Sequence, residues 1–98
     1  MSNLHVEWDA EKSATNRRKH GVSFDEASTV FYDENALFMA DPKHSETEDR
    51  FLLLGMSFKP RVLVVCHCYR GKEDTIRIIS ARRADRSERE QYSWRRRR

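Results

Sequence analysis

The sequence is poor in residues that interrupt or cross-link a chain, with 3 glycines, 2 prolines and 2 cysteines among 98 residues. No linker rich in proline, serine or glycine divides it, so we expect one domain over residues 1–94, followed by a basic tail at 95–98. No stretch approaches the ~20 apolar residues of a membrane span, and the first residues lack the pattern of a signal peptide. We therefore expect a cytoplasmic protein with no membrane segment.

The two cysteines, Cys66 and Cys68, lie two residues apart in an apolar run. Strand alternation places both side chains on one face of a sheet and His67 on the other. A zinc site normally takes four ligands with wider spacing, so we interpret the cysteines as free thiols of the core. The sequence contains no clustered metal motif, and it predicts neither a metal nor another cofactor.

Positive charge is concentrated near the C-terminal end, although the net charge is only +3. Residues 77–98 contain nine arginines against Asp85, Glu88 and Glu90, whereas residues 1–76 are net acidic. An arginine binds phosphate through a planar fork and stays charged at any cellular pH, so this cluster favours a polyanionic partner. For Arg95–Arg98 alone, a solvated tail is an equally good interpretation.

Hydrophobic periodicity and turn residues predict an α+β fold with two N-terminal helices, an antiparallel sheet of about four strands and a C-terminal helix. Asp9 is expected to cap the first helix and Gly21 to end it, and Ser23 and Glu26 have the spacing of a capping box for the second. The expected segments are an extended lead-in or short strand at 5–8, helices at 10–20 and from 24 to about 31, strands at 36–40, 51–58, 61–69 and 75–81, and a helix from 87 onward.

Four stretches, in their order and spacing, resemble the BrnT family of toxins and together cover about residues 6–93. They are Trp8-Asp9 with Lys12, Asn16, 19–24, Glu26-Ala27, Val30-Phe31 and Asp33; Asp41 with 44–46 and Arg50; Gly55 with 61–65; and 76–82 with Glu88 and Tyr92. One departure is Ala10, where the family often has proline, and it concerns the start of the helix rather than the chemistry.

The resemblance implies a RelE-like fold and a metal-independent endoribonuclease that inhibits translation by cleaving RNA. It also implies a BrnA-like antitoxin with a ribbon-helix-helix portion, joined to the toxin in a 2:2 complex that contacts operator DNA only through the antitoxin. In RelE-like nucleases the last strand and last helix supply an arginine and a tyrosine to the scissile phosphate. Arg82 and Tyr92 match those positions, and we predict that both are catalytic.

Cleavage without a metal needs a base for the 2′-hydroxyl, an acid for the departing 5′-oxygen and cations for the developing phosphorane charge. Arg82 would stabilise that charge, while Tyr92 would stack on a base or orient the 2′-hydroxyl. The alternative for Tyr92 is a structural ring that seals the edge of the core.

The first helix carries Lys12, Asn16, Lys19 and His20 at a spacing that predicts one polar stripe, suited to a phosphate backbone. An ordinary solvated helix face is the alternative. His20 ends the helix, where the dipole favours its protonated form, so it could donate a proton or simply cap the helix. We predict that it is catalytic and that Lys12, Asn16 and Lys19 bind RNA.

On the sheet, strand alternation places Arg61 on one face with His67, and Arg77 on one face with Ala81. Arg77 is predicted to be catalytic, and Arg61 and Arg83 to bind RNA. His44, in the long polar connection at 41–49, is a further candidate, and a loop histidine without a function is the alternative.

Two other readings stay open. The same fold could be a nucleic-acid-binding or regulatory module without catalysis, or an interaction protein whose polar surface serves only the antitoxin.

Overall fold

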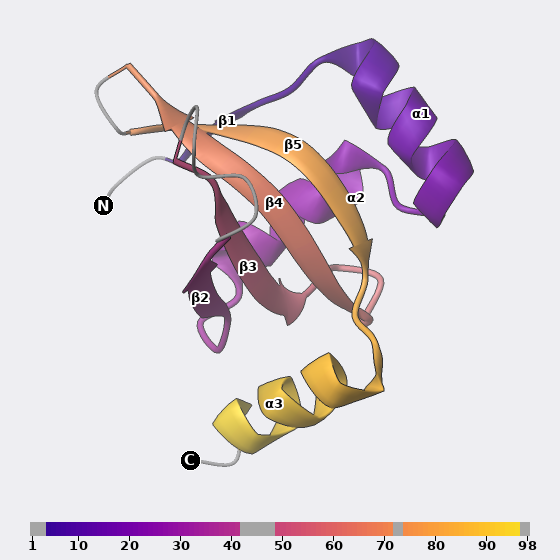
Figure 1. Cartoon of the computed structure of the whole chain (residues 1–98), viewed down its shortest axis with the longest axis vertical. Coiled ribbons are helices and arrows are strands. Elements are labelled where there is room, and N and C mark those ends of the chain that lie inside the picture. Colours follow the sequence, from indigo (N-terminus) through magenta and orange to yellow (C-terminus); the bar gives the residue numbers. More distant parts are fainter. Residues whose placement is uncertain (1–3, 42–48, 72–73, 97–98) are drawn as a thin grey trace.

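The computed structural model describes residues 4–41, 49–71 and 74–96. Its elements are β1 (His5–Glu7), α1 (Ala10–His20), α2 (Phe24–Thr29), the 3₁₀ helix η1 (Val30–Tyr32), β2 (Leu37–Ala40), β3 (Phe51–Met56), β4 (Val62–Arg70), β5 (Thr75–Arg83) and α3 (Arg86–Arg96). This is the predicted α+β class, with helices and strands in the predicted order (Figure 1). Within these residues, none of the helices has the length and apolarity needed to cross a membrane.

The sheet has five strands in the order β1-β5-β4-β3-β2. The four strands from β2 to β5 are antiparallel, as predicted. The lead-in is also a strand, and it pairs in parallel with β5, with Glu7 opposite Arg77. The sequence did not reveal this pairing because three residues carry too little periodicity to identify a partner.

Two separate cores lie on the two faces of the sheet. On one face, Val22, Phe24 and Ala27 from the α1–α2 region pack on Leu63 and Ile78. On the other face, the core is smaller and α3 contributes its tyrosine. Its fully buried members are Leu54, Val64, Ala84 and Tyr92. Figure 1 shows α3 at the end of the sheet where β5 finishes, away from α1 and α2.

A β-bulge interrupts the pairing of β4 with β5. Cys66 lies opposite Ser80 but His67 lies opposite Ile78, so Ile79 is the extra residue. A bulge of one residue exchanges the faces for the rest of a strand, because side chains alternate with a period of two.

The bulge changes which arginines of β5 share a face. Arg77 and Arg82 lie opposite Cys68 and Val64, both on the α3 side of the sheet. Ala81 instead belongs to the core beneath α1 and α2. The prediction that Arg77 and Ala81 share a face was therefore wrong.

The helix signals of the sequence are mostly confirmed. Asp9 accepts hydrogen bonds from the first backbone N–H groups of α1, and Gly21 ends that helix with φ 71°. Ser23 Oγ accepts from the Glu26 N–H at 3.1 Å. The capping box is nevertheless incomplete, because the Glu26 carboxylate is buried and binds Ser57 and Arg61 instead.

Asn16 joins three parts of the chain. Its amide nitrogen donates to the Val22 oxygen at 2.8 Å and to the Ala81 oxygen at 2.7 Å, and its amide oxygen accepts from the Ala81 N–H at 3.1 Å. The side chain is 6% exposed. The predicted phosphate-binding stripe on α1 was therefore wrong for Asn16, because its polar atoms bind the protein's own backbone.

We expect Asn16→Ala to lower the free energy of unfolding by about 2–4 kcal/mol, because it leaves three buried backbone groups without partners. Lys12→Ala, an exposed change on the same helix, should alter stability by no more than ~0.5 kcal/mol. Urea unfolding followed by circular dichroism measures both. Equal stability of the two variants would contradict the role given to Asn16.

Candidate functional site

The end of β5 and the start of α3 are joined by an ion pair between Arg82 and Glu88. The two terminal nitrogens of Arg82 donate to the two carboxylate oxygens of Glu88, both at 2.8 Å. The Arg82 side chain is 44% exposed and that of Glu88 is 17% exposed. The arginine fork predicted to face a phosphate is therefore occupied by a carboxylate.

Glu88 also takes part in the start of α3. Its N–H donates to Asp85 Oδ1 at 2.8 Å, and the Asp85 N–H donates to Glu88 Oε1 at 2.9 Å, which is a complete capping box. The hydrogen bonds from Arg82 lower the pKa of Glu88, although burial opposes them. Glu88 is therefore ionised at neutral pH.

Three arginines line a hollow of about 230 Å³ beside this ion pair: Arg61 from the β3–β4 turn, Arg83 from β5 and Arg89 from α3. The hollow is also lined by apolar residues, among them Met56, Val62 and Ala84. A pocket with several guanidinium groups is suited to a phosphate, because each group can donate two parallel hydrogen bonds to its oxygens.

The three arginines differ in how much of their charge is available. Arg61 is paired with the buried Glu26 through Nε at 2.7 Å and a terminal nitrogen at 2.5 Å. The hydrogen bonds from Arg61 lower the pKa of Glu26, so this pair is ionised and close to neutral overall. Arg89 donates to the Ala84 oxygen at 2.8 Å, a neutral acceptor. Arg83 has no side-chain partner within the described part of the chain.

The basic end of α1 lies next to this hollow. Arg61 donates to the Gly21 oxygen at 2.8 Å, which places the last turn of α1 beside the β3–β4 turn. Lys19 and His20 in that turn are exposed, so both are available to a ligand. Lys12 is also exposed but lies at the opposite end of the helix.

Arg77 does not join this cluster. It lies near the start of β5, whereas Arg82 and Arg83 end that strand, and it pairs with Glu7 of β1 at 2.9 Å. This ion pair links the side chains of β5 and β1.

Tyr92 is in the core rather than at a ligand surface. Its residue is 3% exposed, and its hydroxyl donates to Asp33 Oδ2 at 2.6 Å. Burial is the main cause that raises the pKa of Tyr92 to about 12, and the adjacent Asp33 contributes to the shift. The prediction that this ring stacks on a base was therefore wrong, and the alternative of a structural tyrosine describes it.

Arg61 requires a similar correction. The sequence marked it as an RNA-binding residue, but its guanidinium is bound to Glu26 and Gly21. A buried carboxylate needs such a partner, since an uncompensated buried charge is strongly destabilising. The fold therefore depends on Arg61, whichever ligand occupies the hollow.

Arg89 is the residue that the sequence prediction missed. The sequence places it on a helix, and only the hollow that it shares with Arg61 and Arg83 indicates that it could bind a ligand. In the sequence, Arg89 could have been noticed because it follows Glu88 near the start of α3, close to the end of the last strand. His44 lies outside the described residues.

The other candidates on β4 are buried. Cys66 and Cys68 are free and buried, as predicted. His67 is fully buried, and burial lowers its pKa, so it is neutral. It packs edge-on against Phe31 at 4.8 Å and Tyr69 at 5.6 Å between ring centroids. These groups are part of the packing. Across the described ranges, no three His, Cys, Asp or Glu residues are grouped so that they could hold a metal ion.

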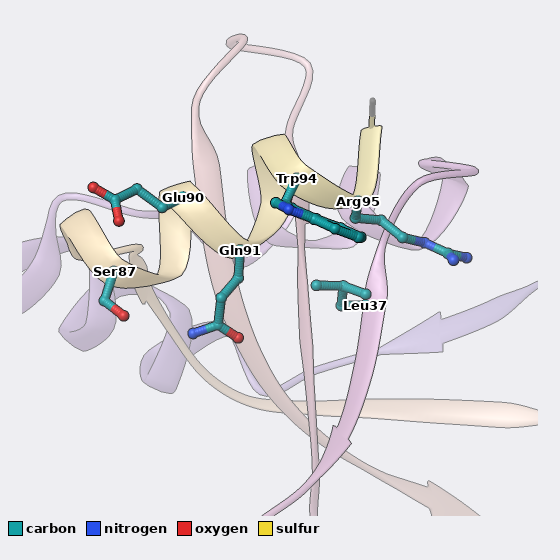
Figure 2. Close-up of a pocket in the computed structure, with 6 residues that line it drawn as sticks. All are labelled: Leu37, Ser87, Glu90, Gln91, Trp94 and Arg95. Carbon is teal, nitrogen blue, oxygen red and sulfur yellow. The ribbon is translucent and has the colours of Figure 1, made fainter. Parts of the chain in front are cut away.

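A second and larger hollow, of about 460 Å³, lies between α3 and β2 (Figure 2). Trp94 and Leu37 form its apolar side, and Figure 2 shows them facing one another across it. Its remaining lining is Ser87, Glu90, Gln91 and Arg95, which includes one charge of each sign. Because it lacks an excess of positive charge, it is less suited to a polyanion than the hollow at the end of β5.

The fold is similar to that of a solved ribonuclease toxin, BrnT, from Brucella abortus. The two chains superimpose with a TM-score of 0.63 and 22% sequence identity, over 86% of this chain and all of the Brucella chain. Residues 8–88 match the family described as ribonuclease toxin, BrnT, of type II toxin-antitoxin systems.

This chain therefore belongs to the BrnT family of ribonuclease toxins. A type II system pairs its toxin with an antitoxin, so membership implies such a partner. Among curated proteins, no sequence matches this chain.

We expect Tyr92→Phe to reduce stability by about 1–2 kcal/mol while leaving any RNA cleavage by the folded protein unchanged. Burial would raise the pKa of Asp33, but hydrogen bonds from Met56, Tyr92 and Asn35 outweigh it and lower that pKa below 3.8. The ionised carboxylate therefore stabilises the fold above pH ~4, and this contribution is lost as the pH falls through the lowered pKa.

The difference in stability between wild type and Tyr92→Phe should accordingly be full at pH 7 and shrink as the pH falls through the lowered pKa of Asp33. Chemical unfolding across this pH range measures it. A fully folded Tyr92→Phe protein that had lost its cleavage activity would return Tyr92 to the catalytic site.

Proposed function

We propose that this chain is a metal-independent endoribonuclease that inhibits translation, and that RNA binds at the end of the sheet where β5 meets α3. The observation that carries the proposal is the hollow shared by Arg61, Arg83 and Arg89, beside the Arg82–Glu88 pair. Membership of a ribonuclease toxin family supports the reaction class.

In this proposal Arg83 and Arg89 bind the scissile phosphate. Arg83 offers a guanidinium with no competing partner in the described chain, and Arg89 retains donors beyond the one used on Ala84. Both can stabilise the negative charge that develops on the phosphorane in a preorganised site. Arg82 can join them through the donors that Glu88 leaves unused.

The exposed end of α1 supplies the proton donor. His20 is exposed at the C-terminal end of α1. An imidazolium near the departing 5′-oxygen can protonate it, as the reaction requires. Two exposed lysines extend the positive surface along which the RNA backbone would continue: Lys19 beside His20, and Lys12 near the start of α1.

We expect Arg83→Ala to slow single-turnover cleavage of a 5′-labelled RNA by at least ~100-fold, because it removes a cation that stabilises the transition state. The matched control is Arg86→Ala, which removes the same charge from an arginine that is 87% exposed and that, among the described residues, forms an ion pair with Glu90 alone. The control should cleave at nearly the wild-type rate. EDTA should change neither rate, and loss of wild-type activity in EDTA would show that a metal is required.

A module that binds nucleic acid without catalysis is the second candidate. The observation in its favour is that Tyr92 is buried and the Arg82 fork is occupied, so fewer groups are free for proton transfer than the sequence suggested. In the cleavage assay, tight RNA binding by wild type without any product would identify this function.

We expect expression of the chain alone to arrest bacterial growth, and co-expression of a BrnA-like ribbon-helix-helix partner to restore it. The reason is that an active ribonuclease must be masked by its antitoxin. Arg83→Ala, expressed at the same soluble level, should permit growth. Unimpaired growth with the wild-type chain at verified soluble expression would count against the toxin function.

A further inference from the structure

One carboxylate lies within the arginine-rich end of the sheet. Glu88 is held by both terminal nitrogens of Arg82, and its side chain is 17% exposed, so it is covered but still reached by solvent. Arg82 lies opposite Val64, on the face of the sheet that also contains Ala84, and Ala84 lines the hollow with Arg83 and Arg89. Glu88 is therefore adjacent to the place where the proposed reaction puts a phosphate.

We infer that Glu88 is the general base of the proposed RNA cleavage, the group that takes the proton from the attacking 2′-hydroxyl. The inference rests on the proposed function and assigns a role that the function itself leaves open. Its basis is that a single guanidinium can hold the base and the phosphate together. Arginine has five N–H donors, and Glu88 uses two of those on Arg82.

A third N–H of Arg82, on a terminal nitrogen, is donated to the Arg83 backbone oxygen at 3.4 Å. The Nε–H and one terminal N–H are left for a non-bridging phosphate oxygen. A phosphate bound there would be separated from the carboxylate only by the width of the guanidinium. The 2′-oxygen is attached to the ribose next to that phosphate, so the same contact brings it towards Glu88. The bound phosphate need not displace Glu88.

The other nearby carboxylates are less suited to this role. Glu26 is 1% exposed and is fixed by Arg61 and Ser57. Asp85 binds the N–H of Glu88 and holds no arginine by a hydrogen bond in the described residues. Glu90 pairs with Arg86, which lies one turn before it on α3.

The proposed step is balanced by two proton transfers. The Glu88 carboxylate accepts the proton of the 2′-hydroxyl as the bond from the 2′-oxygen to phosphorus forms. The bond from phosphorus to the 5′-oxygen breaks, and that oxygen takes a proton from the His20 imidazolium. The products are a 2′,3′-cyclic phosphate and a 5′-hydroxyl, with Glu88 protonated and His20 neutral until both exchange protons with water.

Glu88→Gln separates catalysis from structure. The amide oxygen can still accept from the Asp85 N–H, as glutamine does in capping boxes, but it cannot accept a proton as a base. After the wild-type cleavage position has been mapped, we expect Glu88→Gln to lower the single-turnover rate by at least ~100-fold. Its Kd for the same RNA with a 2′-deoxy nucleotide at that position should stay within about threefold, because removing a negative charge does not weaken phosphate binding. Glu90→Gln is the control and should cleave as wild type does.

A substrate with sulfur in place of the 5′-bridging oxygen distinguishes the base from the acid. Sulfur leaves without protonation, so this substrate should restore cleavage by His20→Ala but not by Glu88→Gln. Restored cleavage by Glu88→Gln would overturn the inference, as would a wild-type rate on normal RNA or a loss of rate matched by a loss of affinity. In each of these cases wild type still cleaves RNA; absence of cleavage by wild type would instead refute the proposed function.

Discussion

The amide of Asn16 fixes the relative positions of the parts that form the candidate site. Its hydrogen bonds tie the last turns of α1 to the segment that leads into α2, at Val22, and to the end of β5, at Ala81. His20 lies four residues after Asn16, and Arg83 lies two residues after Ala81. Because the amide is buried, water cannot replace its hydrogen bonds, and the two elements cannot move apart without leaving backbone groups unpaired.

Ion pairs then determine which of the many arginines remain available. The fold binds Arg61 to a buried carboxylate and Arg77 to the first strand, and neither residue is a free cation. Arg83 and Arg89 keep unused donors and share one hollow. The net charge of +3 therefore does not describe this end of the sheet. The positive charge available there depends on which arginines lack a carboxylate partner among the described residues, rather than on the total number of arginines.

The sequence predicted the fold class and the order of elements well, because helix caps and apolar alternation are local signals. It predicted the residues of the site less well, since polarity alone does not show whether a side chain faces water. Asn16 and Tyr92 have polar atoms that bind partners 65 and 59 residues away. Arg61 finds its carboxylate 35 residues away. Pairings over such separations arise from the tertiary fold and leave no periodic pattern.

The bulge at Ile79 determines which face each later residue of β5 occupies. In the sequence it corresponds to two adjacent isoleucines, 78 and 79, which interrupt the alternation of β5. Deleting Ile79 would leave a strand of regular alternation, in which every later side chain is turned to the opposite surface. Arg82 would then lie on the face that α1 and α2 cover, and Arg83 would lie on the face that α3 covers. In this chain, the number of residues in β5 before Arg82 and Arg83 therefore determines which face of the sheet each of these arginines occupies.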